Sequence, residues 1–458
     1  MSVQKLSLCR EISYDAFIHV TKQQMRPDEA TDLLYRAKKS PIQRIDRNFI
    51  TEVVYGSLRW YSKLHWILQK TSKRDLTKLS PEVRAALILG TYQIFYMDRV
   101  PDRAAVNESV EYIRHKGQSK AVPFVNGVLR SIARRSEYFA KPNKDKQPSE
   151  FLALQYAHPR WIIDRWSRRF NYARVKSILS ANNQKPPYTV RINSIKVPHD
   201  QGANFRNQIL KEEKNHSDIG HIPTALYLKS FPNIDKDSLF RRGFFSIQDE
   251  ASQLIGFLVS PQKNTLIYDA CSGPGGKTAH LYELTAGQAE IHAIEKTNKQ
   301  IEKAKESFAR LGHSNINLVH KDFLEFCPKQ KADKILLDAP CSGLGTIRRH
   351  PEAKLLKKAS IVESLLELQQ KLITHALSLL KPGGELIYSV CSFETEETID
   401  HLTWLKENFS DQIKVISPRE RLSEYYKKFV TKEGILLIYT DNRHNMDGFG
   451  AFIIEKIK

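Results

Sequence analysis

Apolar residues recur at helical spacing through the first part of the chain. Four stretches carry apolar side chains three and four positions apart, at 28–39, 46–71, 80–97 and 125–136. This spacing predicts amphipathic helices. Ser80 and Pro81 stand where an N-cap and a first helical residue are expected. We therefore predict an all-α domain over residues 1–140.

Residues 141–150 are polar and charged and include two prolines, as in a linker. Residues 151–244 combine a helical stretch, 159–182, with the strand-like "PYTVRINSI". This combination predicts a small α/β module that is rich in arginine and tryptophan.

Short apolar runs alternate with helical patterns in the last part of the chain, 245–458. The runs lie at 265–270, 289–296, 316–322, 334–340 and 384–392. Such alternation predicts βαβ units and a parallel, doubly wound, Rossmann-like sheet. The overall expectation is a multidomain chain with α and α/β parts.

The turn after the first of these runs has the residues of a nucleoside site. The run ends at Asp269, and the turn contains Cys271, Ser272, Gly273, Pro274, Gly275 and Gly276. Glycines let a ligand approach the backbone at the carboxyl end of a strand. The spacing is neither G-x-G-x-x-G nor that of a P-loop, which disfavours a dinucleotide and a phosphate cradle.

Acidic residues end the next two runs. Glu295 is suited to the two hydroxyls of a ribose, and Asp322 to an adenine amino group. An acidic residue at the end of a single strand is usually a helix cap. Acidic residues at the ends of three successive runs, Asp269, Glu295 and Asp322, together with the glycine turn favour a nucleoside site. A ligand with adenosine and no phosphate pocket points to S-adenosylmethionine.

The charge of the chain indicates a polyanionic partner. The 458 residues carry 71 Lys and Arg against 51 Asp and Glu, giving a net charge of +20. A solvated basic surface is the simpler explanation of any single run of basic residues. For the excess of positive charge along the entire chain, nucleic acid is the expected partner. "HPRWIIDRWSRRF" is either an RNA-binding segment or a helix whose Trp161 and Trp166 face the core. In both cases three of its arginines, Arg160, Arg168 and Arg169, are predicted to contact RNA. Arg348 and Arg349 of "TIRRHPE" are predicted to do the same.

Five scattered cysteines, at 9, 271, 327, 341 and 391, predict free thiols and neither a disulfide framework nor a zinc site. The chain begins without a signal peptide and has no long apolar stretch, so we expect a soluble cytoplasmic protein with no membrane or metal partner. Nothing in the sequence suggests more than a monomer.

Two of the thiols suggest covalent chemistry. Cys341 and Cys391 each directly follow an apolar run. Carbon 5 of cytosine is a poor nucleophile, but a thiolate added to carbon 6 converts the ring into an enamine that can attack a sulfonium methyl. A nearby basic group such as Lys277, Arg348 or Arg349 would favour the thiolate. The spacing does not decide which thiol attacks.

Three motifs in this order, "DACSGPGGKT", "DAPCSGLGTIRRHPE" and "YSVCSFETEE", resemble those of the RNA cytosine 5-methyltransferases of the RsmB/Nop2 (Fmu/Sun) family. The segments "LSPEVRAALILGTYQIFYMDRVPDRAAVNESVEYIRHKG" and "FVNGVLRSIAR" are similar to a NusB-type RNA-binding domain. The resemblance implies small-subunit (16S) ribosomal RNA as substrate, alone or in a partly assembled particle.

The resemblance also implies roles for single residues. Cys391 would attack carbon 6, Cys341 would assist product release, Asp338 would contact the cytosine, and Lys277 would lie close to the reacting groups. A methyl-donor pocket would be lined by the glycine turn from Asp269 to Lys277, with Glu295, Asp322 and Asp338. Two positions depart from the family pattern, Val390 where threonine is usual and Gly450 where an aromatic is usual.

Other functions stay open. Methylation of an exocyclic amine predicts "NPPY" or "DPPY" where this chain has "DAPC". A cytosine methyltransferase acting on transfer RNA or large-subunit RNA differs from the first hypothesis only in its substrate. A non-catalytic NusB-like assembly factor predicts loss of the reacting residues, which are intact here.

Overall fold

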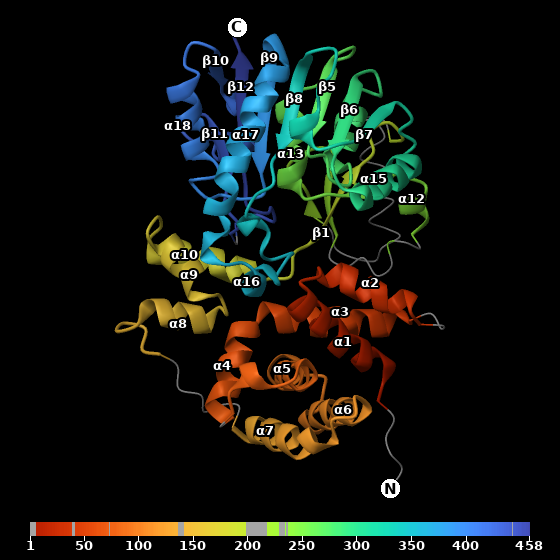
Figure 1. The fold of residues 1–458 in the computed structure, drawn as a ribbon, viewed down its shortest axis with the longest axis vertical. Helices are drawn as coiled ribbons and strands as arrows, with labels where there is room; N and C mark the ends of the chain where they lie inside the picture. The colour runs from red at the N-terminus through yellow and green to blue at the C-terminus, as the bar shows by residue number, and fades with distance from the viewer. Residues whose placement is uncertain are drawn as a thin grey trace. The chain divides into compact units, whose positions relative to one another are not determined.

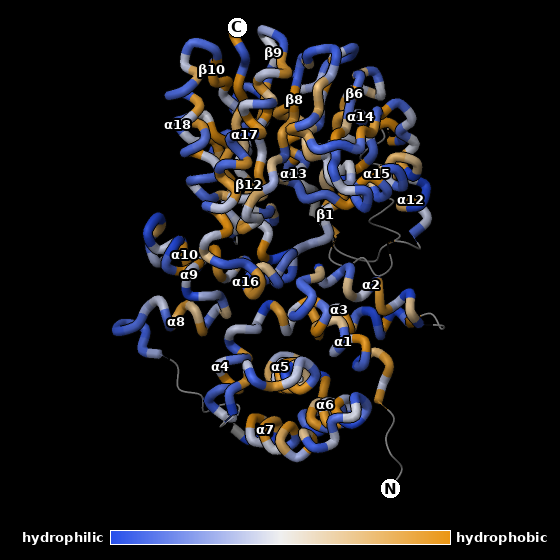
Figure 2. The backbone as a smooth tube through the Cα atoms, in the orientation of Figure 1, coloured by the Kyte–Doolittle hydropathy of each residue, from blue (hydrophilic) through white to orange (hydrophobic). Residues whose placement is uncertain are grey.

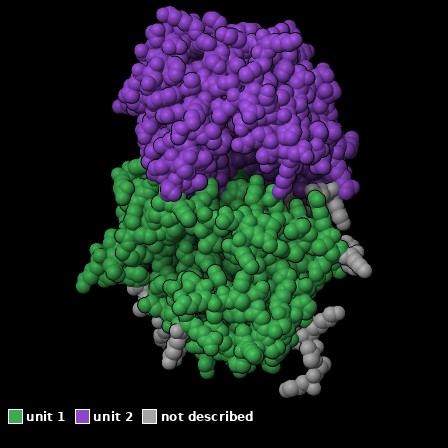
Figure 3. Space-filling model, in the orientation of Figure 1, with its two compact units in different colours: residues 1–185, 347–359 green, residues 186–346, 360–458 purple. Residues whose placement is uncertain are grey.

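The computed structural model describes residues 6–38, 42–72, 74–135, 142–197, 218–228, 234, 237–441 and 443–458. The chain divides into two compact units, residues 1–185 with 347–359 and residues 186–346 with 360–458 (Figure 3). None of the helices in the described ranges combines the length and apolarity needed to cross a lipid bilayer. The finer division into domains at 1–140, 151–244 and 245–458 stays a prediction.

The first unit consists, in its described residues, of helices and their connections (Figure 1). They are α1 (Leu8–Gln23), α2 (Pro27–Arg36), α3 (Arg44–Arg59), α4 (Tyr61–Thr71), α5 (Pro81–Tyr96), α6 (Asp102–His115), α7 (Val122–Arg135), α8 (Pro148–Gln155), α9 (Arg160–Ser167), α10 (Tyr172–Asn182) and α16 (Ala353–Leu356). The predicted all-α character of the N-terminal part is confirmed.

Helix α5 is the most buried helix of this unit. The Ser80 hydroxyl accepts a hydrogen bond from the Val83 N–H at 3.3 Å, and Pro81 is the first helical residue, so the predicted cap is confirmed. Val83 and the nine residues from Ala85 to Gln93 are buried in α5. They are buried because α1, α3, α4, α6 and α7 all pack against this helix. The long apolar stretch 46–71, by contrast, forms two helices that are separated at Trp60.

Residues 347–359 belong to the helical unit although they connect two elements of the second unit. Lys354 in this segment is buried, and its Nζ donates to the Arg59 carbonyl at 3.0 Å and to Asn183 Oδ1 at 2.6 Å. The Arg348 carbonyl accepts from Arg59 Nη2 at 3.3 Å. These bonds anchor the segment between α3 and the end of α10.

The second unit begins with a four-stranded antiparallel sheet in the order β2-β3-β1-β4. Its strands are β1 (Tyr188–Ile192), β2 (Asp218–Ile219), β3 (Ala225–Leu228) and β4 (Phe245–Ile247). Val190 pairs with Leu226 on one side and with Ile247 on the other, and the short helix α12 (Ser238–Arg241) precedes β4. The predicted strand in "PYTVRINSI" is confirmed.

The larger sheet has eight strands in the order β10-β12-β9-β8-β5-β6-β7, with β11 paired to β12. They are β5 (Leu266–Ala270), β6 (Glu290–Glu295), β7 (Ile316–His320), β8 (Ala332–Asp338), β9 (Leu380–Val390), β10 (Ile413–Ile416), β11 (Ile435–Ile438) and β12 (Phe449–Lys456). Strands β5 to β9 are parallel and β12 runs antiparallel to β9, β10 and β11. The predicted doubly wound sheet is confirmed, with an antiparallel edge.

Helices cover this sheet as expected for βαβ units. They are α13 (Glu250–Val259), α14 (Gly276–Leu284), α15 (Asn298–Leu311), α17 (Glu363–Leu379), α18 (Ile399–Asn408) and α19 (Glu424–Lys427). Figure 2 shows hydrophobic stretches along the strands, which agrees with the complete burial of β5 and β11. The chain order reverses between β5 and β8, and ligands of open α/β sheets bind at such a point, beyond the carboxyl ends of the strands.

Candidate active site

The turn between β5 and α14 permits close approach to its backbone. Gly273 and Gly275 have φ angles of 57° and 80°, a left-handed conformation that side chains disfavour. A Cβ on Gly275 would lie 2.5 Å from the ring of Phe308, whereas one on Gly273 would meet nothing within 4 Å. The open side of the turn is therefore at Gly273, and Gly275 is needed for packing.

Glu295, at the end of β6, is held against this turn. Its Oε2 accepts from the Gly273 N–H at 3.0 Å, and its Oε1 accepts from the N–H and the hydroxyl of Thr297 at 2.8 and 2.7 Å. Glu295 is 8% exposed as a residue, and the hydrogen bonds to both oxygens fix the orientation of its carboxylate. A ribose hydroxyl at this edge would find a rigid acceptor.

Asp322, after β7, has two contacts. Its Oδ1 accepts from the Leu324 N–H at 3.0 Å and so caps a short 3₁₀ turn, while its Oδ2 lies 4.0 Å from Lys296 Nζ. The helix-cap explanation that the sequence left open is therefore correct for one oxygen. The same carboxylate also lines a pocket, and its contact with an adenine amino group stays a prediction.

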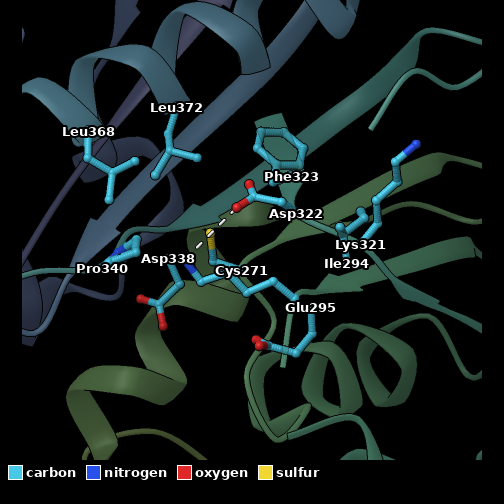
Figure 4. A pocket seen from close by; sticks show the side chains of 11 residues that line it. Cys271, Ile294, Glu295, Lys321, Asp322, Phe323, Asp338, Pro340, Leu368 and Leu372 are labelled. Carbon is cyan, nitrogen blue, oxygen red and sulfur yellow. Dashed lines mark ion pairs between the residues drawn. The ribbon is translucent and has the colours of Figure 1, made fainter. Parts of the chain in front are cut away.

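A pocket of about 200 Å³ lies beyond the carboxyl ends of β5, β6 and β8 (Figure 4). Its lining combines acidic and apolar side chains, from Cys271, Ile294, Glu295, Lys296, Lys321, Asp322, Phe323, Asp338, Pro340, Leu368 and Leu372. Asp269 Oδ1 and Ser272 Oγ are buried in the adjacent turn without a protein hydrogen-bond partner. Apolar walls, acidic ends and unused polar atoms fit an adenosine-bearing ligand with a cationic group.

Burial perturbs two groups of the turn. It raises the pKa of Asp269 to about 7, although Thr278 Oγ1 donates to its Oδ2 at 2.6 Å. Burial, followed by the charges of Asp338, Asp269 and Glu295, raises the pKa of Cys271 to about 12. Cys271 is therefore a neutral thiol, and its predicted place beside the methyl donor stays a prediction.

Lys277 and Asp338 form an ion pair at the centre of the site. Lys277 Nζ lies 2.6 Å from Asp338 Oδ2, and Asp338 Oδ1 accepts from the Ser389 hydroxyl at 2.8 Å. Burial lowers the pKa of Lys277, but the charge and hydrogen bond of Asp338 and the charge of Cys391 outweigh it and raise the pKa. The ammonium group is therefore retained within the field of the Cys391 thiol.

The two thiols that the sequence singled out are in contact. Cys341 follows β8 and Cys391 follows β9, and their sulfurs lie 3.3 Å apart across 50 residues of sequence. Both side chains are partly exposed. The neighbouring parallel strands β8 and β9 bring them to the same edge, since Asp338 pairs with Ser389 in the register.

The environment differs between the two sulfurs. The hydrogen bond with Cys391 and burial, with smaller contributions from Glu397 and Asp338, raise the pKa of Cys341 well above its usual value. Lys277 is stabilised by a negative charge on Cys391, and by reciprocity it favours the Cys391 thiolate. Cys341 is therefore a protonated thiol beside Cys391.

The predicted RNA-contacting arginines have different surroundings within the helical unit. Arg160 is exposed but paired with Glu150 and Asp164, the latter at 2.8 Å. Arg168 is exposed and Arg169 partly so. Trp166 is fully buried, which confirms that this tryptophan faces the core.

The two arginines of "TIRRHPE" also belong to this unit. Arg348 is 4% exposed, and Arg349 is partly exposed. In this conformation Arg349 can present more of its side chain to a ligand than Arg348, and RNA contact by either stays a prediction.

The apolar wall of the pocket was not predicted. Leu368 and Leu372, four residues apart on one face of α17, and Phe323 line it. Nothing in their sequence context marks them, because a leucine on an amphipathic helix is expected in any core.

Arg191 of β1 was also missed. It is fully buried, and its Nε and Nη2 donate to the two oxygens of Glu283 at 2.9 and 2.8 Å. Its Nη1 donates to the Gly276 carbonyl at 2.9 Å and also bonds Gln248. Arg191 thus ties the smaller sheet to the glycine turn, and only the fold reveals its partner 92 residues away.

Three family models match successive parts of the chain. They are the NusB family at 8–134, the ferredoxin-like domain of RsmF/B-like methyltransferases at 158–235, and 16S rRNA methyltransferase RsmB/F at 256–454. The described helices α1 to α7 lie largely in the first range, and the eight-stranded sheet lies largely in the third.

Relatives match over nearly the whole chain. "Probable ribosomal RNA small subunit methyltransferase B" of Bacillus subtilis (strain 168) is 30% identical over 97% of this chain and 98% of that protein. "Ribosomal RNA small subunit methyltransferase B" of Escherichia coli O6:K15:H31 is 31% identical over 77% of this chain and 80% of that protein.

Solved structures share the fold. PH0851 superimposes with a TM-score of 0.83 over 99% of this chain and 100% of that one, at 23% identity. NSun6 from Pyrococcus horikoshii, solved with SFG, has a TM-score of 0.58 over 66% of this chain and 100% of that one, at 20% identity.

Proposed function

Because this chain belongs to the 16S rRNA methyltransferase RsmB/F family, we propose that it methylates carbon 5 of a cytosine in small-subunit ribosomal RNA through a covalent adduct on Cys391. The observation that carries the proposal is the 3.3 Å contact between the sulfurs of Cys341 and Cys391, beside the ion pair of Lys277 and Asp338. A cytosine C5 mechanism needs a thiolate, a proton source and a second group for product release. These four side chains meet all three needs.

Methyltransferases of this family use S-adenosylmethionine, which supplies an electrophilic methyl group on a sulfonium. In this chain Glu295 and Asp322 would accept hydrogen bonds from the ribose and the adenine. The apolar wall of Phe323, Leu368 and Leu372 would contact the adenine ring. The unpartnered Asp269 Oδ1 would attract the cationic methionine portion.

The first chemical step is addition of the Cys391 thiolate to carbon 6 of the cytosine. The S–C6 bond forms, the C5=C6 π electrons move toward the ring amidine, and N3 takes a proton from the pair of Lys277 and Asp338. The ring is then a neutral enamine. Lys277, held charged by Asp338 at 2.6 Å, also favours the thiolate before the attack.

Carbon 5 would then take up the methyl group that S-adenosylmethionine supplies, and the electron pair of the broken S–CH3 bond would stay on the donor sulfur. The Lys277 amine, neutral after the first step, takes the proton of the Cys341 thiol, and the Cys341 thiolate then accepts the proton from carbon 5. The C5=C6 bond re-forms as the S–C6 bond breaks, which returns Cys391 as a thiolate, and the N3 proton passes to solvent. The balance is one methyl group transferred and one proton released.

The acceptor base has to leave its stack to meet these groups, at a cost of a few kcal/mol. The basic charge of the chain and its NusB-family domain would offset this cost by binding the RNA backbone. We expect the protein to act as a monomer on rRNA, naked or partly assembled, in the cytoplasm.

Transfer RNA and large-subunit RNA are weaker candidates as substrates. The relatives that match this chain nearly end to end carry a small-subunit name, and the NusB-family match covers residues 8–134. A non-catalytic assembly factor is disfavoured by the contact of both thiols beside an intact ion pair.

Bisulfite sequencing tests the proposal at the level of the RNA. Ribosomal RNA from cells with and without this protein should differ at one cytosine of the small-subunit RNA, protected only when the protein is present. Protection in a transfer RNA or in large-subunit RNA would overturn the assignment of substrate.

Cysteine variants test the mechanism. Cys391→Ser should abolish methyl transfer and leave binding of S-adenosylmethionine near normal. Cys341→Ala should remain covalently attached to RNA, seen as a slowed band on a denaturing gel. Free turnover by either variant would contradict the role given to that thiol.

A further inference from the structure

Glu397, between β9 and α18, is a fully buried carboxylate. Its Oε1 accepts from the Ser342 backbone N–H at 2.7 Å, and its Oε2 accepts from the Ser342 hydroxyl at 2.5 Å. Gln369 Nε2 of α17 donates to Oε1 at 3.2 Å. Burying a carboxylate is costly unless its oxygens accept hydrogen bonds, and all three bonds here come from the Cys341 turn and the helix behind it.

The amide of Gln369 is oriented by a neighbour. His401 Nε2 lies 2.7 Å from Gln369 Oε1, and burial lowers the pKa of His401 to about 4, so the neutral ring must donate from Nε2. The amide nitrogen of Gln369 is then directed to the Pro340 carbonyl at 2.8 Å and to Glu397. The residues on both sides of Cys341, at 340 and 342, are thereby fixed.

The same network reaches the second thiol turn. The hydroxyls of Ser342 and Ser392 lie within hydrogen-bond distance at 3.2 Å, and Ser392 Oγ accepts from the Glu394 N–H at 3.1 Å. The Gly345 N–H donates to the Cys391 carbonyl at 3.1 Å. The turns after β8 and β9 are therefore joined by hydrogen bonds on the protein side of both sulfurs.

We propose that Glu397 is a positioning residue that holds the Cys341 turn against the Cys391 turn, so that both sulfurs meet one cytosine. The effect of Glu397 on methyl transfer rests on the proposed function, whereas its structural role in keeping the two turns together does not. A carboxylate suits this position because it accepts from an N–H and a hydroxyl of the same residue at once. A glutamine at position 397 would place an amide NH2 group, itself a donor, opposite the Ser342 hydroxyl. The hydrogen bond that this hydroxyl now donates to Glu397 Oε2 would be weakened.

Contact between the sulfurs can be measured without RNA. Diamide oxidises two adjacent thiols to a disulfide: the thiols lose two electrons and two protons, and the diamide N=N bond is reduced to a hydrazine. The rate at which the Cys341–Cys391 peptide pair forms, followed by mass spectrometry, reports how often the sulfurs meet. We expect Glu397→Gln to slow this rate at least tenfold.

Glu407→Gln is the matched control, since it makes the same carboxyl-to-amide change at an exposed position on α18. It should oxidise within twofold of wild type. Should Glu397→Gln fail to fold, Ser342→Ala, which removes one hydroxyl bond and keeps the carboxylate, should still slow oxidation about threefold. Oxidation of the folded variant at the wild-type rate would overturn the positioning role.

Methyl transfer to in vitro transcribed small-subunit rRNA gives the second readout. Glu397→Gln should lower kcat at least tenfold with KM for S-adenosylmethionine within threefold, because the pocket residues are untouched. An equal loss in kcat and cofactor affinity would indicate general misfolding and overturn the role. A wild-type protein that oxidises rapidly but methylates no cytosine would reject the proposed function alone.

Discussion

Val390 and Gly450 are direct register partners where β9 pairs antiparallel with β12. They are also the two positions that depart from the motifs this chain resembles, so both departures fall at one point of the sheet, next to Cys391. A Cβ on Gly450 would lie 2.3 Å from Thr398 Cγ2 and 3.0 Å from the Ser392 carbonyl oxygen. The glycine therefore leaves room for Thr398, and an aromatic at 450 would require Thr398 to move.

Gly450→Ala should destabilise the protein by about 1–3 kcal/mol through overpacking. Thr398 cannot rotate away cheaply, because its Oγ1 donates to the Glu394 carbonyl at 2.7 Å. Thr398→Ser removes the obstructing methyl and keeps this bond, so the double variant should recover most of the loss. Denaturant unfolding measures the free energy of unfolding of the single and double variants. Additive effects of Gly450→Ala and Thr398→Ser would contradict a contact between position 450 and the Thr398 methyl group.

Asp338→Asn should lower the rate of methyl transfer at least 100-fold, because Lys277 loses its counter-charge and the site loses its proton source. Cofactor affinity, measured by calorimetry, should change far less. The matched control is Asp333→Asn on the same strand, where Asp333 pairs with Lys381 at 2.6 Å, and its rate should stay within twofold. Similar losses in both variants would argue for a structural role of the strand and against the ion pair.

The strand ends of the active site were predictable from sequence because parallel strands gather their carboxyl ends at one edge. Asp269, Glu295 and Asp338 each close an apolar run, and the runs are the observed strands. The contact of Cys341 with Cys391 follows from the same rule, since β8 and β9 are neighbours.

Long-range partners were not predictable. Glu397 lies in an acidic run that reads as a solvated surface, yet it is fully buried because three donors converge on it. Arg191 resembles any other arginine of a basic chain until Glu283 is seen beside it. Arg348 was predicted to contact RNA, and the sequence did not show that its segment packs into the helical unit and leaves the residue 4% exposed.

The stability of the protein without cofactor should depend on Asp269 between about pH 4 and pH 7. An unfolded aspartate titrates near pH 3.9, whereas burial raises the folded pKa to about 7, so the folded state holds a proton that the unfolded state has lost. The stabilising effect is complete below the unfolded pKa and disappears as the pH rises through 7, a change on the order of 4 kcal/mol.

Asp269→Asn removes this titration and keeps an oxygen for Thr278. The melting temperature of the variant relative to wild type should therefore rise from pH 5 to pH 8 and level off above. A constant difference across this range would show that Asp269 ionises normally in the folded state.

Arg168 and Arg160 should contribute differently to RNA binding although they lie at the two ends of one short helix. Arg160 is already paired with Glu150 and Asp164, so a phosphate would have to compete with two carboxylates. Arg168 is exposed at the C-terminal end of α9. Arg168→Ala should therefore reduce the slope of log affinity against log salt by about 0.7, the value of one phosphate contact on single-stranded RNA.

Arg160→Ala should change the slope by less than half of that amount. Fluorescence anisotropy with small-subunit rRNA fragments over a salt series measures both variants under the same conditions. A larger effect for Arg160 than for Arg168 would mean that RNA displaces the two carboxylates, and that the ion pairs of α9 serve to release a binding group.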